Sequence, residues 1–137
     1  MIRIRTFMKR EEGTMALEFA LLMPAILLLI FSTVELGSAW YAKQIMITAS
    51  REGARLGAIY SVDGQTNEYV EQEVENLLFD TSFPMQADVD VTGADGETGD
   101  TVRVAINADY DFPILSRLVP GVLGTVTLSS ITEMRHE

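Results

Sequence analysis

The stretch TMALEFALLMPAILLLIFSTV, residues 14–34, decides the fold of this chain. Its last 16 residues, Phe19 to Val34, carry no charged side chain, and the five before them add one, Glu18. A helix needs about 20 mostly apolar residues to cross the hydrocarbon core of a bilayer. A small domain has little room to bury a helix that is apolar on every side. The sequence therefore predicts a membrane-spanning helix over residues 14–34.

Basic and acidic residues lie on different sides of this stretch. Four of the 10 basic residues precede Gly13, whereas 18 of the 20 acidic residues follow it, and the net charge is −10. A basic segment before an apolar helix predicts a cytoplasmic N-terminus, a single pass through the inner or cytoplasmic membrane, and a periplasmic or extracellular C-terminal domain. The acidic balance argues against a nucleic-acid partner, because phosphate binding needs a basic surface. The absence of cysteine excludes disulfides and Cys-based metal sites.

A cleaved secretory signal is the alternative to a retained anchor. Signal peptides have an apolar region of about 7–15 residues that ends in small residues at the cleavage site. The apolar stretch here is slightly longer, but Gly37-Ser38-Ala39 supplies such small residues. Cleavage there would release a soluble domain, whereas a retained helix keeps the domain on the membrane.

Two residues of the stretch depart from a plain apolar helix. Pro24 has no amide hydrogen and leaves the carbonyl of Ala20 without its helical partner, which membrane helices tolerate as a kink. Glu18 places a carboxylate at the edge of the hydrocarbon, where such residues usually have a partner. The alternative for Glu18 is solvation near the headgroups.

A processing motif precedes the stretch, in the sequence KREEGTMALEF at residues 9–19. A basic leader ends in Gly13, and Glu18 follows five residues later. This arrangement resembles the type IV prepilin pattern, in which a membrane aspartyl peptidase cuts after the glycine on the cytoplasmic side. The resemblance implies a leader peptide over residues 1–13, cleavage between Gly13 and Thr14, and a prepilin peptidase as a partner. The alternative is an unprocessed signal anchor.

The spacing of the motif has a physical rationale. Cleavage would create an ammonium group on Thr14, one helical turn from Glu18. In a neighbouring subunit shifted by about one turn, this ammonium would meet the Glu18 carboxylate. At about 4 Å and an effective dielectric near 20, their Coulomb energy is roughly 4 kcal/mol. Glu18 is therefore predicted to set the axial register between subunits.

The helix is predicted to continue past the membrane through residues 35–61, giving a rod of roughly 70 Å. Gly53 and Gly57 form a small-xxx-small pair that permits close approach of another element. Gly53 belongs to a stripe of apolar residues spaced three or four apart, and Gly57 flanks it. The stripe consists of Ala39, Ala42, Met46, Ala49, Gly53, Leu56 and Tyr60. Two packings remain open for this stripe, against other subunits in a filament or against the protein's own domain.

Several strings of this helix resemble the N-terminal signature of TadE-like proteins, which are pseudopilins of tight-adherence (Flp, type IVc) pilus systems. They are ALEFAL at 16–21, Pro24, Glu35-Leu36-Gly37 and ASREGAR at 49–55. The resemblance covers about residues 10–60, under half of the chain. It implies a role in assembling an Flp pilus, or as its minor component, in surface adhesion. The implied partners are other pilin or pseudopilin subunits, the pilus assembly platform and membrane lipid.

The charged residues of the REGAR string are interpreted as structural. Glu52 and Arg55 are three residues apart and can pair on one helix face. Together with Arg51, they are assigned to helix packing, and Glu52 and Arg55 can also reach a neighbouring subunit.

Residues 62–137 predict a small headpiece. After a turn at residues 61–65, a second helix begins at Thr66 or Asn67 and runs to about Phe79. Alternating apolar residues then predict further elements: strands over 87–91, 102–112 and 125–134, a hairpin loop over 93–100 and a helical turn over 115–118. The expected fold is α+β and pilin-like, with one helix packed on a three- to four-stranded antiparallel sheet at the end of the long helix.

The hairpin region also contains a weak calcium pattern. Asp88, Asp90 and Gly93 match positions 1, 3 and 6 of an EF-hand loop, but position 12, which requires Glu, is Gly99. A solvated hairpin is the preferred interpretation. A weak site involving Asp88, Asp90 and Asp95 is the alternative, and no cofactor is expected.

No catalytic constellation is apparent in the sequence, so the chain is predicted not to be an enzyme. There is no Gly-rich phosphate loop and no nucleophile elbow. The only histidine, His136, is next to the C-terminus and is not expected to be held in a site. The alternative function is a membrane-anchored extracytoplasmic binding domain that never enters a filament.

Overall fold

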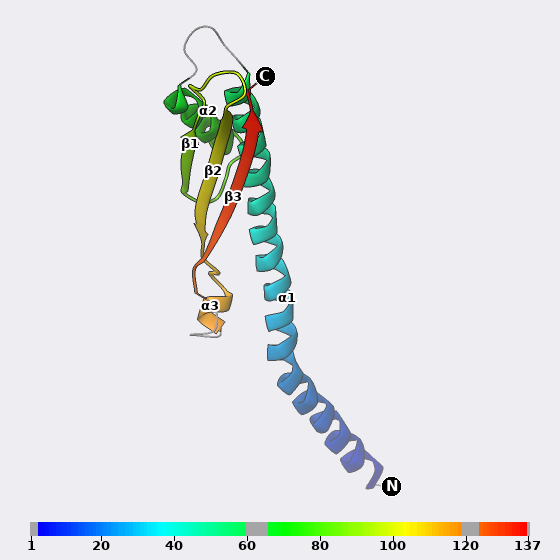
Figure 1. Cartoon of the computed structure of the whole chain (residues 1–137). Helices are drawn as coiled ribbons and strands as arrows, with labels where there is room; N and C mark the ends of the chain where they lie inside the picture. Colours follow the sequence, from blue (N-terminus) through cyan, green and yellow to red (C-terminus); the bar gives the residue numbers. More distant parts are fainter. Residues whose placement is uncertain (1–2, 60–65, 119–123, 137) are drawn as a thin grey trace.

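The computed structural model describes residues 3–59, 66–118 and 124–136, with side chains from Gly13 onward. A long helix carries a small headpiece at its C-terminal end (Figure 1). The elements follow in the order α1 (Arg3–Ala58), α2 (Asn67–Asp80), β1 (Ala87–Thr92), β2 (Thr101–Tyr110), α3 (Leu115–Leu118) and β3 (Val126–Arg135). The α+β prediction is confirmed, while the expected turn at 61–65 lies outside the described residues.

The headpiece has two layers. Its three strands are antiparallel in the order β1-β2-β3. The C-terminal half of α1 packs against β2 and β3, and α2 packs against β1 and α1. The two helices therefore cover one face of the sheet, and the C-terminus lies near the end of α1 (Figure 1).

The first helix is longer than the sequence predicted. It begins at Arg3 instead of near Thr14 and contains 56 residues, which at about 1.5 Å per residue make a rod of about 84 Å. The added turns consist mostly of residues with good helix propensity, weakened only at Gly13. Figure 1 shows α1 bending in its blue, N-terminal part. Pro24 lies inside the helix and is a usual cause of such a bend.

The second helix forms as its sequence predicts. Thr66 is the N-cap, and its hydroxyl oxygen accepts a hydrogen bond from the Tyr69 amide at 3.2 Å. Val70, Val74 and Leu78 are buried along one face. This face packs toward α1 and the sheet.

The central strand β2 supplies much of the core. Val102, Val104 and Ile106 have no exposed surface. Ile106 lies opposite Val89 of β1 and opposite Ser130 of β3. In the hairpin loop, Gly93 has a φ of +85°, and a side-chain carbon there would collide with the Thr101 carbonyl. Glycine is therefore required where the predicted loop begins.

The expectation for His136 was wrong. Only 5 % of its surface is exposed, and its Nε2 donates to the Gly93 carbonyl at 2.8 Å. Its backbone amide donates to the Asp100 carbonyl at 2.9 Å, and its carbonyl accepts from the Gly99 amide. The antiparallel pairing of β3 with β2 brings the end of the chain back to the hairpin loop, so a near-terminal residue becomes part of the structure.

A buried polar cluster joins α1 to β3. The Ser50 hydroxyl lies 3.0 Å from that of Ser130 and 2.9 Å from that of Thr132, and it donates to the Ile47 carbonyl at 3.1 Å. A hydroxyl has one proton and two acceptor positions. Ser50 can therefore donate only one of these bonds, and its contacts with both β3 hydroxyls tie β3 to the helix at this height.

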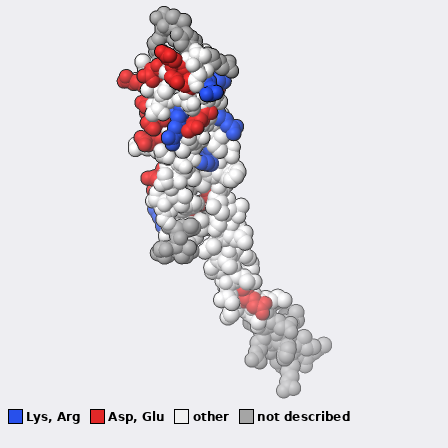
Figure 2. All heavy atoms as spheres, in the orientation of Figure 1, with Lys and Arg blue, Asp and Glu red and all other residues white. Residues whose placement is uncertain are grey.

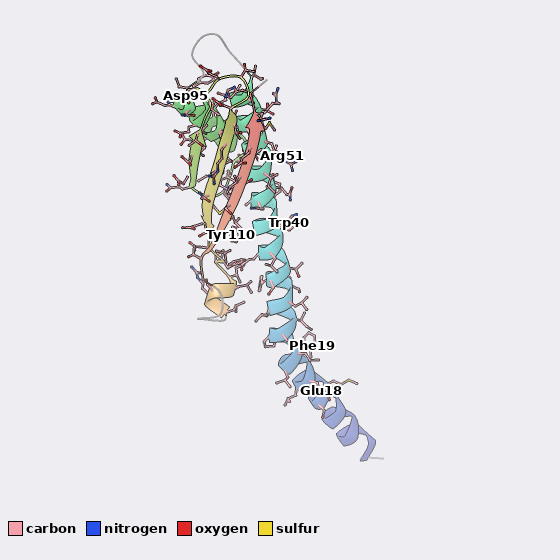
Figure 3. The ribbon with its side chains drawn as sticks, in the orientation of Figure 1. Glu18, Phe19, Trp40, Arg51, Asp95 and Tyr110 are labelled. Carbon is pink, nitrogen blue, oxygen red and sulfur yellow. The ribbon has the colours of Figure 1, made fainter. Side chains whose placement is uncertain are left out.

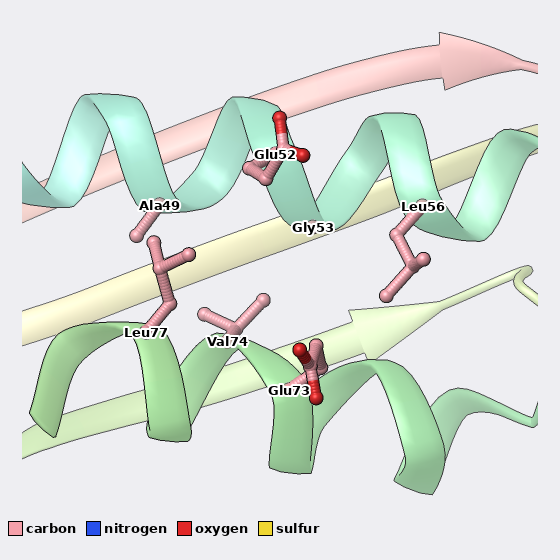
Figure 4. Close-up of a pocket in the computed structure, with 7 residues that line it drawn as sticks. All are labelled: Ala49, Glu52, Gly53, Leu56, Glu73, Val74 and Leu77. Carbon is pink, nitrogen blue, oxygen red and sulfur yellow. The ribbon is translucent and has the colours of Figure 1, made fainter. Parts of the chain in front are cut away.

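Gly53 and Gly57 both contact the protein's own headpiece. A side-chain carbon on Gly53 would overlap Val74 of α2, and one on Gly57 would lie 2.8 Å from Val102 Cγ1 of β2. Figure 4 shows Gly53 facing Val74 across the seam between α1 and α2. Of the two packings that the sequence leaves open, packing against its own domain is present in this structure.

Gly53→Ala should lower the free energy of unfolding by about 1–3 kcal/mol, because the added methyl group overpacks the seam. Gly37→Ala is the matched control, since Gly37 lies in the same helix with no atom within 4 Å of an added carbon. Both changes give a similar gain in helix propensity, so their difference reports on packing. Thermal unfolding of the full chain in detergent micelles, followed by circular dichroism, measures it. Equal melting temperatures for the two variants would contradict the tight contact.

Candidate functional site

The apolar half of α1 makes a surface that the protein itself does not cover. Within the described residues, α1 is the one helix long and apolar enough to cross a membrane, and none of its most apolar 18-residue window is buried. Figure 2 shows acidic side chains gathered on the headpiece, whereas the lower helix is almost free of charge. An exposed apolar surface of this extent marks contact with lipid or with other protein. The helix is thus compatible with a single-pass membrane anchor.

Glu18 is the exception on this surface. Its side chain is exposed near the N-terminal end of the apolar segment, next to Phe19 (Figure 3). In the described part of the chain, the ion pairs join Arg55 to Glu52 and Arg103 to Glu133, all in the headpiece half. The Glu18 carboxylate therefore has no ion-pair partner among the described side chains.

The expected processing junction lies inside the helix. Gly13 and Thr14 are both helical, and a carbon added at Gly13 would meet no atom within 4 Å. The headpiece therefore does not shield Gly13. A peptidase would need to unwind one turn, and glycine lowers the cost of doing so by about 1 kcal/mol relative to alanine.

The REGAR charges lie on the outer face of α1, away from the sheet. Arg51, Glu52 and Arg55 are all exposed. Arg55 donates through Nη2 to Glu52 Oε1 at 2.5 Å and through Nε to Oε2 at 3.2 Å, which confirms the predicted pair. The hydrogen bond from Arg55 lowers the pKa of Glu52, and the same bond raises the pKa of Arg55. The pair forms an exposed polar patch on the part of α1 beyond the apolar segment.

A buried carboxylate that the sequence analysis did not single out closes the membrane-proximal end of the headpiece. Glu35 has only 4 % of its surface exposed. Its Oε1 accepts from the Ile114 amide at 2.5 Å, and its Oε2 accepts from the Leu115 amide at 3.1 Å. The Glu35 backbone carbonyl accepts from the Tyr110 hydroxyl at 3.2 Å. One residue of α1 therefore holds both the end of β2 and the start of α3.

Two partners of Glu35, Tyr110 and Leu115, belong to a small apolar cluster. Tyr110, Phe112 and Leu115 are buried together, and the Tyr110 and Phe112 rings meet edge to face with centroids 5.0 Å apart. Hydrogen bonds from two amides satisfy a carboxylate that burial would otherwise penalise. Phe112 thus contributes to this cluster and not to β2, which ends at Tyr110, two residues before the predicted end of that strand.

The sequence contained a signal for Glu35. It precedes Ala39 by four residues and so falls on the same helix face as the buried stripe. A charge on a buried face needs a partner. The stripe alone therefore indicated that Glu35 would need a partner, although not whether the headpiece or another subunit would supply it.

The acidic hairpin does not assemble a metal site among the described residues, which contain no group of three or more His, Cys, Asp or Glu side chains placed to hold an ion. Asp88 and Asp90 are exposed on alternate positions of β1. Asp95 accepts a hydrogen bond from the Asn67 side chain at 3.2 Å. This hydrogen bond joins the loop to the start of α2.

The comparisons with known proteins concern the same helix. A family model described as TadE-like protein matches residues 13–55. This confirms the resemblance of the segment to the TadE-like family, a structural family associated with Tad/Flp pilus systems. Neither a curated protein nor a solved structure matches the chain. The matched segment includes Gly13, Glu18, Glu35 and the REGAR string, and it ends where α1 has reached the headpiece core.

Glu35→Ala should free the start of α3 from α1. Two partly or fully buried amides would lose their acceptor, at a cost of about 1–3 kcal/mol. We expect faster hydrogen exchange at the Ile114 and Leu115 amides, with little change in α2. Glu52→Ala is the control, because an exposed ion pair contributes little to stability. Unchanged exchange at both amides would show that Glu35 does not hold α3.

Proposed function

We propose that this chain is a TadE-like pseudopilin that a prepilin peptidase processes between Gly13 and Thr14 and that acts in assembling an Flp (type IVc) pilus, or as its minor component, in surface attachment. One observation carries the proposal. The helix segment that matches the TadE-like family model runs without interruption from an uncovered apolar surface into the core of the headpiece. A subunit built in this way transmits the position of its anchor to its headpiece.

The face of α1 that packs on the headpiece is covered by the same chain, so contacts between subunits must use other surfaces. The space beside Gly53 is filled by Val74, and the space beside Gly57 is filled by Val102 of the same chain. A neighbouring subunit is therefore expected to use the apolar segment below the headpiece and the outer face that carries Arg51. This assigns the small-residue stripe to folding and the exposed residues of the helix to assembly.

Glu18 is proposed to pair with the new N-terminus of a neighbouring subunit. The Thr14 ammonium, once formed, would lie one helical turn away along the same rod. An ion pair at the edge of the hydrocarbon is favoured by a lower effective dielectric than water provides. Because a shift of one turn breaks the pair and leaves a charge facing lipid, the contact would select one axial register.

Processing is tested by the N-terminal sequence and intact mass of protein extracted from membranes. We expect the mature chain to begin at Thr14, and Gly13→Ala should reduce the cleaved fraction because the added methyl group hinders the extended backbone that a peptidase binds. Gly37→Ala is the control, since both glycines are helical and have open space around them. A chain that begins at Met1 would favour an anchored binding domain, and one that begins near Trp40 a secreted domain.

Glu18→Gln should abolish or strongly reduce pilus formation while membrane insertion persists, because the amide keeps the shape of the carboxylate and removes its charge. Electron microscopy and the recovery of sheared filaments measure pili, and carbonate extraction measures insertion. Glu68→Gln, on the exposed side of α2, removes one charge elsewhere and should leave pili unchanged. Normal pili in Glu18→Gln cells would refute the role of this carboxylate.

A further inference from the structure

The short helix α3 lies beside the apolar part of α1 and below the sheet. It follows β2 at the end of the headpiece nearest the N-terminal half of the long helix (Figure 1), and it contacts α1. Glu35 fixes its start, because the Ile114 and Leu115 amides both bond to that carboxylate.

The last residue of α3 reaches the predicted membrane span. Leu118 lines an open groove together with Met23, Leu27 and Phe31 of α1. Phe31 and Leu27 precede Glu35 by four and eight residues, which is roughly 6 and 12 Å along a helix axis. If the span occupies residues 14–34, these positions lie within the hydrocarbon of the leaflet nearer to the headpiece.

Aromatic residues mark the water boundary above this point. Trp40 and Tyr41 are both exposed on α1, just past the apolar segment. Exposed Trp and Tyr are enriched at membrane–water interfaces. Trp40 lies five residues, or about 7.5 Å, farther along α1 from the predicted span than Glu35. Glu35 and the start of α3 are therefore placed at the inner limit of the headgroup layer.

The side chains of α3 and of Ile114, the residue before it, suit this depth. Ile114 and Leu118 face outward with 36 % and 51 % of their surfaces exposed, and Leu115 is buried against α1 and β2. Arg117, the one charged residue between Phe112 and Leu118, is exposed and has a long stem that lets its charge reach the headgroups. The Glu35 carboxylate provides acceptors for two amides that lipid cannot bond.

We propose that α3 dips into the leaflet nearer to the headpiece and that Ile114 and Leu118 contact lipid acyl chains. The groove between Leu118 and α1 is then filled by an acyl chain. This second contact fixes the height and tilt of the headpiece above the bilayer, which a single helix alone leaves free. The inference depends on the membrane-anchor part of the proposed function and adds lipid as a partner of the headpiece itself.

Depth-dependent fluorescence quenching tests this proposal. The chain has no cysteine, so Leu118→Cys in the full chain carries a single environment-sensitive NBD label. The labelled protein is reconstituted in vesicles of phosphatidylethanolamine and phosphatidylglycerol. Nitroxide groups on the acyl chains quench labels in lipid, and iodide in the buffer quenches labels in water. We expect the label at 118 to show blue-shifted emission, to lose emission with the lipid nitroxide and to be protected from iodide.

Two control labels bracket the result. Leu29→Cys, on the span with 67 % of Leu29 exposed, should report lipid, and Phe79→Cys, on α2 with 84 % of Phe79 exposed, should report water. If the label at 29 is not quenched by lipid nitroxides, the membrane anchor itself is wrong. If 29 reports lipid but 118 reports water, the anchor stands and the proposal for α3 is overturned.

A third pattern would also overturn the proposal. Protection of the label at 118 from both quenchers would indicate that protein, such as a second copy of the chain, covers α3. Ile114→Cys is a second labelling position that guards against a local effect of the Leu118 substitution. Agreement of both labels with the label at 29 supports insertion of α3 into lipid.

Discussion

The headpiece depends on the packing of α1 into its core. Met46, Ala49 and Ala54 of the helix belong to the same buried cluster as the core residues of α2 and β2. The small residues of α1 let the backbone approach closely, so that valines of α2 and β2 fill the space above Gly53 and Gly57. A headpiece of this size would bury little apolar surface without the helix. The C-terminal half of α1 and the headpiece therefore share one core, and a change in one affects the other.

A single helix serves two environments, and its composition changes between them. Below Glu35 the side chains are large, apolar and uncovered, as in Leu21 and Leu29. Above it, the face toward the sheet carries small residues and the opposite face carries charges. Large apolar side chains in the lower half suit a membrane anchor, with which this helix is compatible. Close packing against a sheet in water suits the upper half, where each buried group adds to stability.

Much of the headpiece followed from local periodicity, and the failures have a common cause. The capping residue Thr66 predicted the start of α2, and the alternation of apolar residues predicted β2, since both patterns depend on neighbours within one element. Glu35 and His136 bond to residues far away in sequence: the start of α3 for Glu35, and the loop after β1 for His136. Such pairs are decided by how the elements assemble, which single-element patterns do not contain.

Glu18 and Glu35, which both belong to α1, differ in what their carboxylates require. Glu35 is satisfied inside the chain, because two backbone amides and a cluster of aromatic and apolar side chains surround it. Glu18 lies 17 positions earlier on the same rod and has no ion-pair partner among the described side chains. A charge at the edge of hydrocarbon is costly without a partner, so Glu18 would destabilise an isolated subunit whose helix spans a membrane. In the proposed assembly, a cation that a neighbouring subunit supplies at Glu18 would remove this cost, and the contact between the subunits would lie in the lower half of α1.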